Sequence, residues 1–225
     1  RAGRAVAVVG SGLSCAAGYP SWTELLQGIC DESLRLCPQH RRTIATAWNA
    51  IERDPFGAAG LLLDILGPQF PMVVIRRLGR RQRFVGRAEA LAEAGAGGCS
   101  GPLWDAIDPD VPVVARPTLS HRQLMQLGLT SIVVTTNYDS LLEDAAPVRP
   151  AVYSWSDRGV PDQIARGVPL VLKLHGDAAH PRDIILAREQ YTGEQFMSAT
   201  RSAVGALLAT SRPLWIGYGH SDPDL

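Results

Sequence analysis

Short, continuous runs of apolar residues recur along the chain and predict buried β-strands. The first run, residues 4–12 (RAVAVVGSG), is rich in β-branched residues and ends in glycines, which is typical of a strand that leads into a tight turn. Three more runs have the same form, namely 130–136 (TSIVVTT), 168–174 (VPLVLKL) and 213–218 (PLWIGY). Because these runs do not alternate with polar residues, they favour a parallel sheet that is covered on both faces.

Helix-like stretches separate these strands, at residues 22–36, 120–127, 140–145 and 189–209. The alternation, with right-handed crossovers, predicts an α/β fold, a Rossmann-like doubly wound parallel sheet. Such sheets bind ligands beyond the carboxyl ends of their strands. Residues 47–117 break the alternation, since they are helical in pattern up to Arg83, then rich in Gly and Ala, then rich in Pro. We interpret this segment as an inserted helical module.

Arginines are concentrated in the middle of that module, at Arg76, Arg77, Arg80, Arg81, Arg83 and Arg87. Their spacing favours a solvated helix face, with a surface that docks a partner or nucleic acid as the alternative. Over the whole chain, 22 basic and 22 acidic residues give a formal net charge of zero. No overall field therefore attracts nucleic acid or a membrane surface, and we expect the domain to bind neither directly.

The length and the 46% of hydrophobic residues suffice for one catalytic domain spanning residues 1–225. We expect it to be a fragment of a longer chain, because it begins without an initiator Met and stops directly after a turn-like segment. Cys15, Cys30, Cys37 and Cys99 form no CxxC pair, so a zinc site is not indicated and no metal is expected. No apolar run approaches the ~20 residues of a membrane span, and no signal peptide is evident, so the expected location is cytoplasmic.

A glycine-rich loop follows the first strand and contains Gly10, Ser11, Gly12, Ser14 and Gly18. Glycines at a strand-to-helix turn let backbone N–H groups approach a pyrophosphate, and the helix N-terminus favours negative charge. The ordinary dinucleotide fingerprint would need a glycine where Cys15 stands. The loop alone is therefore equally consistent with a plain turn, and we interpret Cys15 as a small loop residue.

Four short motifs resemble the sirtuin family and occur in the family's order, each at the end of a strand. GSGLSCAAGYPSW (10–22) resembles the sirtuin opening, TTNYD (135–139) the Thr-Gln-Asn-x-Asp segment, LHG (174–176) the His-Gly pair and GYGH (217–220) the Gly-Thr-Ser turn. The resemblance covers roughly residues 4–22 and 130–225. The chain lacks the paired CxxC zinc ligands of sirtuin deacylases and has Ser21-Trp22-Thr23 in place of their Asp-Phe-Arg, which argues against deacylation of proteins.

Tyr138, the segment GYPSW (18–22) and the ending SDPDL (221–225) resemble instead the sirtuin-like domains of bacterial antiphage systems, of the Thoeris-type or short-Argonaute-associated group. The resemblance implies an NAD hydrolase that cleaves the nicotinamide–ribose bond and yields nicotinamide and ADP-ribose or a cyclic isomer. It also implies an NAD-depleting antiphage effector of abortive infection. Such an effector is controlled by a regulatory domain or partner subunit that senses infection, within a homo-oligomer or larger assembly.

Asn137 and His175 are the predicted catalytic residues. Cleavage passes through an oxocarbenium-like ribose, so oxygen lone pairs must lie near the developing positive charge. The neutral amide of Asn137 can orient a water molecule and bind the ribose without adding charge. A histidine titrates near neutrality, so His175 suits a general base.

The predicted NAD-binding residues are the five of the glycine-rich loop together with Trp22, Thr136, Asp139, Gly217 and Tyr218. Trp22 either covers the nicotinamide or packs in the core. Asp139 either orients the Asn137 loop or ribose, or caps the next helix. Gly217 and Tyr218 follow the fourth strand, where the family contacts the adenosine half. The remaining histidines are interpreted as structural: His40, His121, His180 and His220.

Two alternatives stay open on the residues alone. The same fold could bind NAD or ADP-ribose as a non-catalytic sensor, because a fold does not establish turnover. The segments HGDAAH and HSDPD could instead supply a metal-dependent hydrolase through His175, Asp177, His180, His220 and Asp222.

Overall fold

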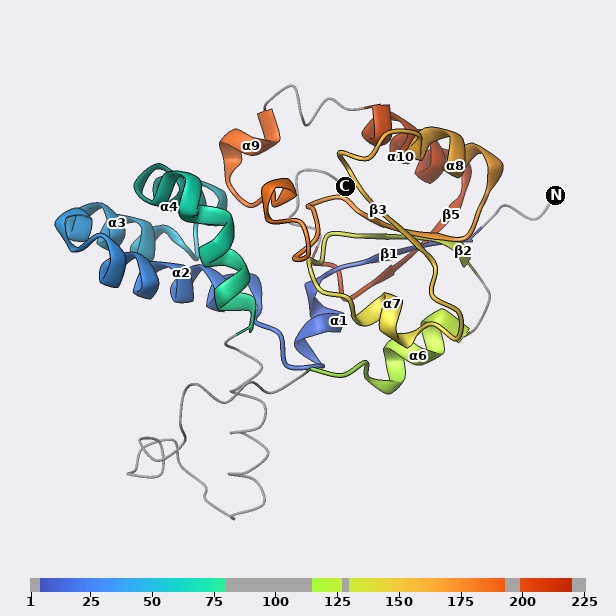
Figure 1. Ribbon diagram of the computed structural model, residues 1–225, viewed down its shortest axis with the longest axis horizontal. Helices are drawn as coiled ribbons and strands as arrows, with labels where there is room; N and C mark the ends of the chain where they lie inside the picture. Colours follow the sequence, from blue (N-terminus) through green and yellow to red (C-terminus); the bar gives the residue numbers. More distant parts are fainter. Residues whose placement is uncertain (1–4, 80–114, 127–129, 193–198, 220–225) are drawn as a thin grey trace, which may run out of the picture.

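A sheet of five parallel strands forms the centre of the computed structural model, which describes residues 5–79, 115–126, 130–192 and 199–219 (Figure 1). The strand order is β3-β4-β2-β1-β5. The strands are β1 (Ala5–Val9), β2 (Thr130–Thr135), β3 (Ala151–Ser154), β4 (Leu170–Lys173) and β5 (Arg212–Ile216). Each neighbouring pair is parallel, which confirms the predicted Rossmann-like α/β fold.

Helices cover both faces of this sheet (Figure 1). One face carries α1 (Ser11–Cys15), α6 (Leu119–Gln126) and α7 (Leu141–Ala145), and the other carries α8 (Val160–Arg166) and α10 (Ala199–Thr210). Successive strand residues point to opposite faces. Val134 and Leu172 therefore join the cluster under α8 and α10, while Val133 and Val171 join the cluster with Leu142 of α7. This two-sided burial explains the continuous apolar runs.

The strand β3 was not predicted from the sequence. It has four residues and lies at the edge of the sheet, and only its last residue, Ser154, is buried. An edge strand of this kind lacks the continuous apolar run that marks the central strands. The helix α8, which follows it, was missed as well, because only Val160 and Ile164 of its seven residues are buried. The predicted helix 189–209 corresponds to α9 (Arg188–Thr192) and α10.

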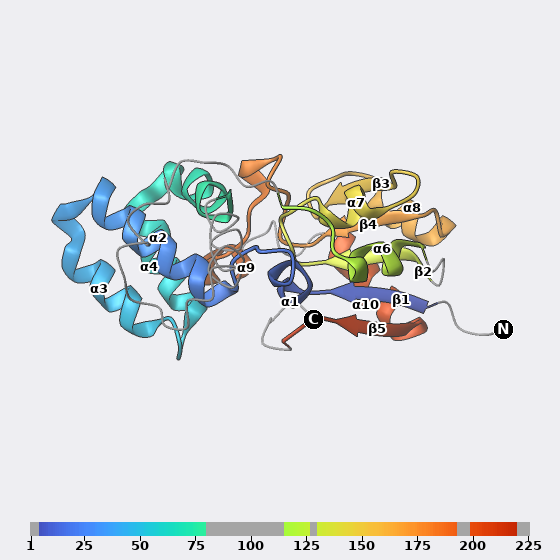
Figure 2. The same cartoon turned by 90° about the horizontal axis from the view of Figure 1, so that it is seen from below.

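A helical region lies beyond the carboxyl ends of the strands (Figures 1 and 2). It contains α2 (Trp22–Leu36), η1 (Pro38–His40), α3 (Arg41–Ala50), α4 (Pro55–Leu66), η2 (Gly67–Gln69) and a helix over residues 70–79. Ser21 and Glu24 form a capping box that starts α2. The region thus begins at Trp22, ahead of residue 47. Since residues 80–114 lie outside the described chain, the bounds 47–117 of the insertion stay a prediction.

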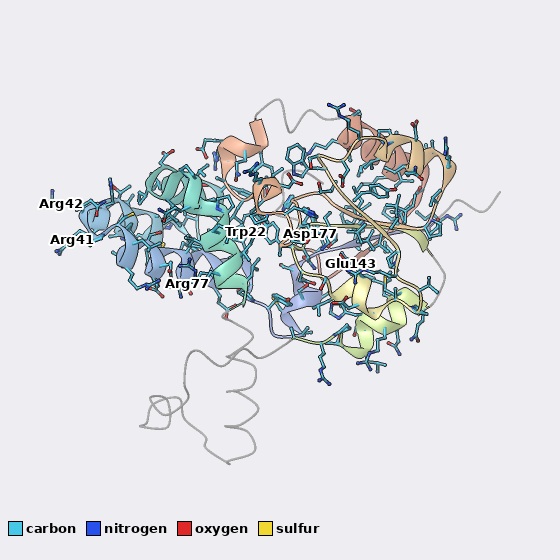
Figure 3. All side chains as sticks on the ribbon, viewed as in Figure 1. Trp22, Arg41, Arg42, Arg77, Glu143 and Asp177 are labelled. Carbon is cyan, nitrogen blue, oxygen red and sulfur yellow. The ribbon has the colours of Figure 1, made fainter. Side chains whose placement is uncertain are left out.

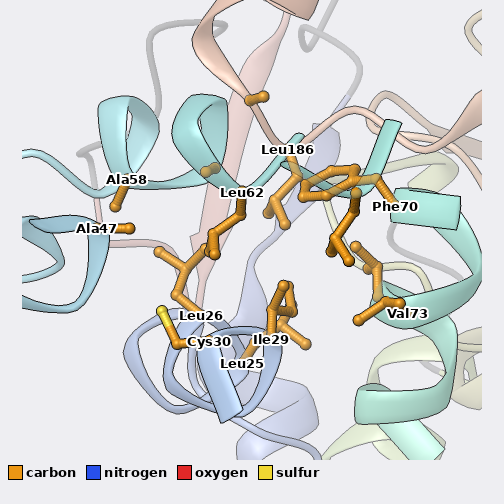
Figure 4. Packing of buried hydrophobic residues seen from close by; sticks show 14 of the residues in the cluster. Leu25, Leu26, Ile29, Cys30, Ala47, Ala58, Leu62, Phe70, Val73 and Leu186 are labelled. Carbon is orange, nitrogen blue, oxygen red and sulfur yellow. The ribbon is translucent and has the colours of Figure 1, made fainter. Parts of the chain in front are cut away.

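The helices of this region pack around a cluster of buried apolar side chains, which includes Leu26 of α2, Leu62 of α4, Phe70 and Val73 (Figure 4). The stretch Pro55–Gly79 has a mean hydropathy of 1.7 and is long and apolar enough to cross a membrane, although charged residues such as Asp64 and Arg76 interrupt its apolar runs. Within the stretch, the 3-10 turn Gly67–Gln69 interrupts the α-helix. Because its apolar face contributes to the cluster, we interpret the stretch as a pair of core helices.

Glu32 of α2 explains part of the arginine cluster. Its carboxylate is fully buried and accepts ion pairs from Arg35, from Arg76 at 2.7 Å and from Arg77 at 2.8 Å. Burial raises the pKa of Glu32, but the hydrogen bonds from Arg35 and Arg76 and the charge of Arg77 outweigh it, so the pKa is lowered. Arg76 and Arg77 therefore join the 70–79 helix to α2. Arg80, Arg81, Arg83 and Arg87 lie outside the described residues.

We expect Glu32→Gln to lower the free energy of unfolding by about 2 kcal/mol at pH 7, because the arginines lose their buried acceptor charge. A carboxyl group whose pKa is lowered by folding stabilises above its unfolded pKa, and this stabilisation is lost as the pH falls. Urea unfolding should therefore show that the wild type loses stability between about pH 5 and pH 3, and that Glu32→Gln loses less. An equal loss in both proteins would contradict the assigned ion pairs.

Candidate active site

A cavity of about 90 Å³ lies at the carboxyl ends of β1, β2 and β4, where the helical region meets the sheet. Asn137, which follows β2, and His175, which follows β4, both line it. Seven of the predicted NAD-binding residues line the cavity as well: Gly10, Ser11, Ser14, Trp22, Thr136, Asp139 and Tyr218. The fold thus brings residues from segments far apart in the sequence to one cavity.

Hydrogen bonds hold the side chain of Asn137 in one orientation. Its Nδ2 donates to the Gly10 carbonyl oxygen at 3.1 Å and to Ser14 Oγ at 2.8 Å. Its backbone N–H donates to Thr135 Oγ1, which in turn donates to the Val9 carbonyl oxygen. Since both acceptors face Nδ2, the other amide atom must be the oxygen. Asn137 Oδ1 is buried and has no hydrogen-bond partner among the described residues.

Ser14 and Asp139 extend this network. Ser14 Oγ accepts from Asn137 and donates to Asp139 Oδ2 at 2.6 Å, a length typical of a charge-assisted bond. Asp139 Oδ1 accepts from the backbone N–H of Leu141 at 3.0 Å, at the start of α7. Asp139 therefore ties the Asn137 loop to Ser14 and to the first residue of α7, whose N-cap is Ser140. A contact between Asp139 and ribose stays a prediction.

His175 lies at the end of a row of aromatic side chains that comes from the helical region. Trp22 packs edge-on against Phe56 at 4.6 Å between ring centroids, Phe56 against Tyr191 at 5.2 Å, and Tyr191 against His175 at 5.4 Å. Tyr191 Oη also lies 3.3 Å from His175 Nε2. These contacts fix the imidazole plane from the α9 side, and they place Trp22 both in the core and at the cavity.

Three predicted residues, Gly12, Gly18 and Gly217, do not line the cavity. A Cβ on Gly12 would lie 2.9 Å from the Gly217 carbonyl oxygen, and one on Gly217, at φ +61°, would lie 2.5 Å from the Leu13 nitrogen. The N–H of Gly12 already donates to the Gly217 carbonyl. Close packing of α1 against the turn after β5 thus accounts for Gly12 and Gly217. That these three residues bind the cofactor stays a prediction.

Seven further residues line the cavity and were not predicted from the sequence: Tyr19, Pro20, Leu25, Leu78, Tyr138, Leu186 and Gly219. Tyr19, Pro20, Tyr138 and Gly219 belong to the recognised motifs, so adjacency could have indicated them. Leu78 and Leu186 are apolar residues of a helix and a loop, and no local signal distinguishes them from core. They make part of the cavity wall apolar.

A metal site among the acidic and histidine side chains finds no support in the part of the chain that the structure describes. There, no group of three His, Cys, Asp or Glu residues could hold a metal ion. His175 faces Tyr191, and Asp177 pairs with Lys173 at 3.0 Å. Two of the residues required for the metal hypothesis, His220 and Asp222, lie outside the described ranges.

The parallel sheet, with its motifs at the carboxyl edge, defines a Rossmann-like α/β domain. Residues 131–225 match the family model described as SIR2-like domain, so this part of the chain is similar to that family. The match includes Asn137 and His175 but not the glycine-rich loop.

Two relatives share the name "NAD(+) hydrolase ThsA". The protein of Acinetobacter baumannii (strain 532279) is 29% identical over 126 residues, which cover 55% of this chain and 26% of the relative. The protein of Enterococcus faecium is 25% identical over 230 residues, which cover 99% of this chain and 38% of the relative. The chain is thus distantly similar to these hydrolases, and it spans less than two fifths of their length.

Proposed function

We propose that this SIR2-like domain hydrolyses NAD at the bond between nicotinamide and ribose. The observation that carries the proposal is the unpaired Oδ1 of Asn137, which is held in place by Gly10 and Ser14 in the same cavity as His175. A buried oxygen without a donor is costly, so such an atom favours a ligand that supplies one. The names of the two relatives agree with NAD as that ligand.

Asn137 and His175 have complementary roles in this reaction. As the bond between ribose C1′ and the nicotinamide nitrogen breaks, its electron pair leaves with nicotinamide and positive charge develops on the ribose. Asn137 Oδ1 accepts a hydrogen bond from a ribose hydroxyl or from the attacking water, and its lone pairs face the developing charge. The water oxygen bonds to C1′, and His175 accepts the proton that the water loses.

The other lining residues fit the nicotinamide end of the substrate. Trp22 Nε1 is a buried donor without a partner among the described residues, and a carboxamide oxygen would satisfy it. Leu25, Leu78 and Leu186 offer an apolar wall to the ring. The volume of about 90 Å³ is below the ~300–1,000 Å³ of whole-ligand sites. The cavity therefore takes only the reacting end of NAD.

The setting of the domain belongs to the same proposal. We place it in the cytoplasm, as an NAD-depleting antiphage effector that a regulatory domain or partner subunit controls within an oligomer. The resemblance to antiphage sirtuin-like domains and the greater length of both relatives support this setting.

The proposal is tested by incubating purified protein with NAD and separating the products by chromatography. The domain and the longest chain that contains it are measured side by side, because a regulatory segment can hold the activity off. We expect one nicotinamide for each NAD consumed, with ADP-ribose or its cyclic isomer as the other product, at a rate that a chelator does not change. Saturable binding with NAD recovered unaltered from both proteins would instead support the sensor.

A further inference from the structure

Lys173, the single lysine of the chain, lies at the end of β4 and is buried. Its side chain is 1% exposed. Taking an ammonium group out of water costs several kcal/mol unless opposite charges and hydrogen bonds compensate. The groups around Lys173 must therefore provide this compensation.

Three oxygen atoms surround the ammonium group. Lys173 Nζ lies 2.8 Å from Glu143 Oε1, 3.0 Å from Asp177 Oδ2 and 2.7 Å from the backbone carbonyl oxygen of Asp139. An ammonium has three donors, so each has one acceptor. Glu143 lies on α7 and Asp177 follows β4, and both are labelled in Figure 3.

These contacts join the two loops that carry the predicted catalytic residues. The Asp139 carbonyl is two residues after Asn137, and Asp177 is two residues after His175. Glu143 differs from both, because it lies on α7 and its ion pair with Lys173 joins that helix to the end of β4, without a contact to the loop that follows His175.

We propose that Lys173 is a positioning residue, which holds Asn137 and His175 at a fixed separation by binding Asp139 O and Asp177 at once. The inference rests on the proposed function for its kinetic consequence, although the link itself is a property of the fold. Displacement of a catalytic group by about 1 Å can cost 100-fold in rate. A buried cross-link between the two loops therefore matters for catalysis more than for binding.

The charges of the cluster are compatible with this role. A lone positive charge beside the cavity would oppose the oxocarbenium-like transition state. Glu143 and Asp177 together carry two negative charges against the single positive charge of Lys173. Burial raises the pKa of Glu143, and the charge of Lys173 lowers it in part. Glu143 thus balances charge, whereas Asp177 forms the link.

Two variants separate these functions. Asp177→Ala removes the ion pair between Lys173 and the His175 loop, and leaves the backbone hydrogen bond from Ala178 N to the Tyr138 carbonyl oxygen at 2.9 Å. At 16% exposure, Asp177 is accessible enough to be replaced. Glu143→Gln is the matched control, because it removes a buried charge and leaves both loop contacts of Lys173 in place. Lys173 itself is not replaced, since an uncompensated pair of buried carboxylates would endanger folding.

The variants are compared in NAD hydrolysis and by the NMR resonance of the His175 Cε1 proton, which needs no turnover. We expect Asp177→Ala to lower kcat by about 10- to 100-fold with KM within about threefold, and to shift the His175 resonance. Glu143→Gln should leave kcat within about threefold and the resonance in place.

An unchanged kcat in Asp177→Ala, or an equal loss in both variants, overturns the inference. A wild type that releases no nicotinamide refutes the proposed function instead. In that case the His175 resonance still tests the positioning role of Lys173. An unshifted His175 signal in Asp177→Ala would show that the ion pair does not position the loop.

Discussion

Replacement of Asn137 by alanine is expected to lower the kcat of NAD hydrolysis by about 100- to 1,000-fold, with a small change in KM. A preorganised polar group that acts on developing charge contributes an effect of this size. The amide of Asn137 is fixed by Gly10 and Ser14, so that Oδ1 is the atom that it presents to the substrate. The expected loss therefore lies in the bond-breaking step.

Asn49→Ala is the matched control for this variant, because Asn49 is an exposed asparagine on α3 of the helical region. Its kcat should equal that of the wild type. Thermal unfolding of both variants separates loss of activity from loss of folded protein. Hydrolysis by Asn137→Ala at the wild-type rate would exclude the assigned role.

Gly176→Ala is expected to destabilise the protein by about 4 kcal/mol or more, an effect at the upper end for single substitutions. Gly176 has φ +92°, and a Cβ there would lie 2.2 Å from the Asp183 carbonyl oxygen and 2.5 Å from its carbonyl carbon. The backbone at Gly176 and the backbone at Asp183 would have to move apart. This movement would strain the nearby hydrogen bond from Ile185 N to the His175 carbonyl oxygen, which is 2.9 Å long. The substitution would thus also displace His175.

Gly159→Ala provides the comparison, because Gly159 has a similar φ of +84° and nothing within 4 Å of the added Cβ. It carries the backbone strain alone, which costs about 1–2 kcal/mol. Urea unfolding measures both variants. If the two lose the same free energy, the close approach of residues 176 and 183 does not constrain the fold.

The carboxyl-edge position of Asn137 and His175 was predictable because the strands before them are marked by continuous apolar runs. Parallel strands carry their following loops to one edge of the sheet. Ser154 and the rest of β3 gave no such run, and an edge strand does not need one. The contacts between α2 and the 70–79 helix depend on Glu32 and arginines 44 residues or more away, which no local pattern encodes.

The hydrogen bonds and contacts among the site residues were less predictable than the identity of these residues. That Ser14 fixes the amide of Asn137, and that Tyr191 contacts His175, follows from distances between segments more than ten residues apart. The structure also brings the Asp183 backbone against Gly176 of the His-Gly pair, a contact between separate segments that the motif does not indicate. The motifs thus indicated which residues lie at the site, whereas the partners of each residue depend on contacts between distant segments.

In the proposed reaction, the nicotinamide ribose of NAD binds against Asn137 Oδ1. The most direct measurement is a crystal structure of the His175→Ala variant with NAD, because loss of the predicted base slows turnover and preserves the Asn137 network. We predict that a ribose hydroxyl or a water at C1′ lies about 3 Å from Asn137 Oδ1, with the nicotinamide ring beside Trp22. NAD bound with its nicotinamide end elsewhere, such as in a cavity of about 410 Å³ beside Ser154 and Asp183, would exclude the role assigned to Asn137.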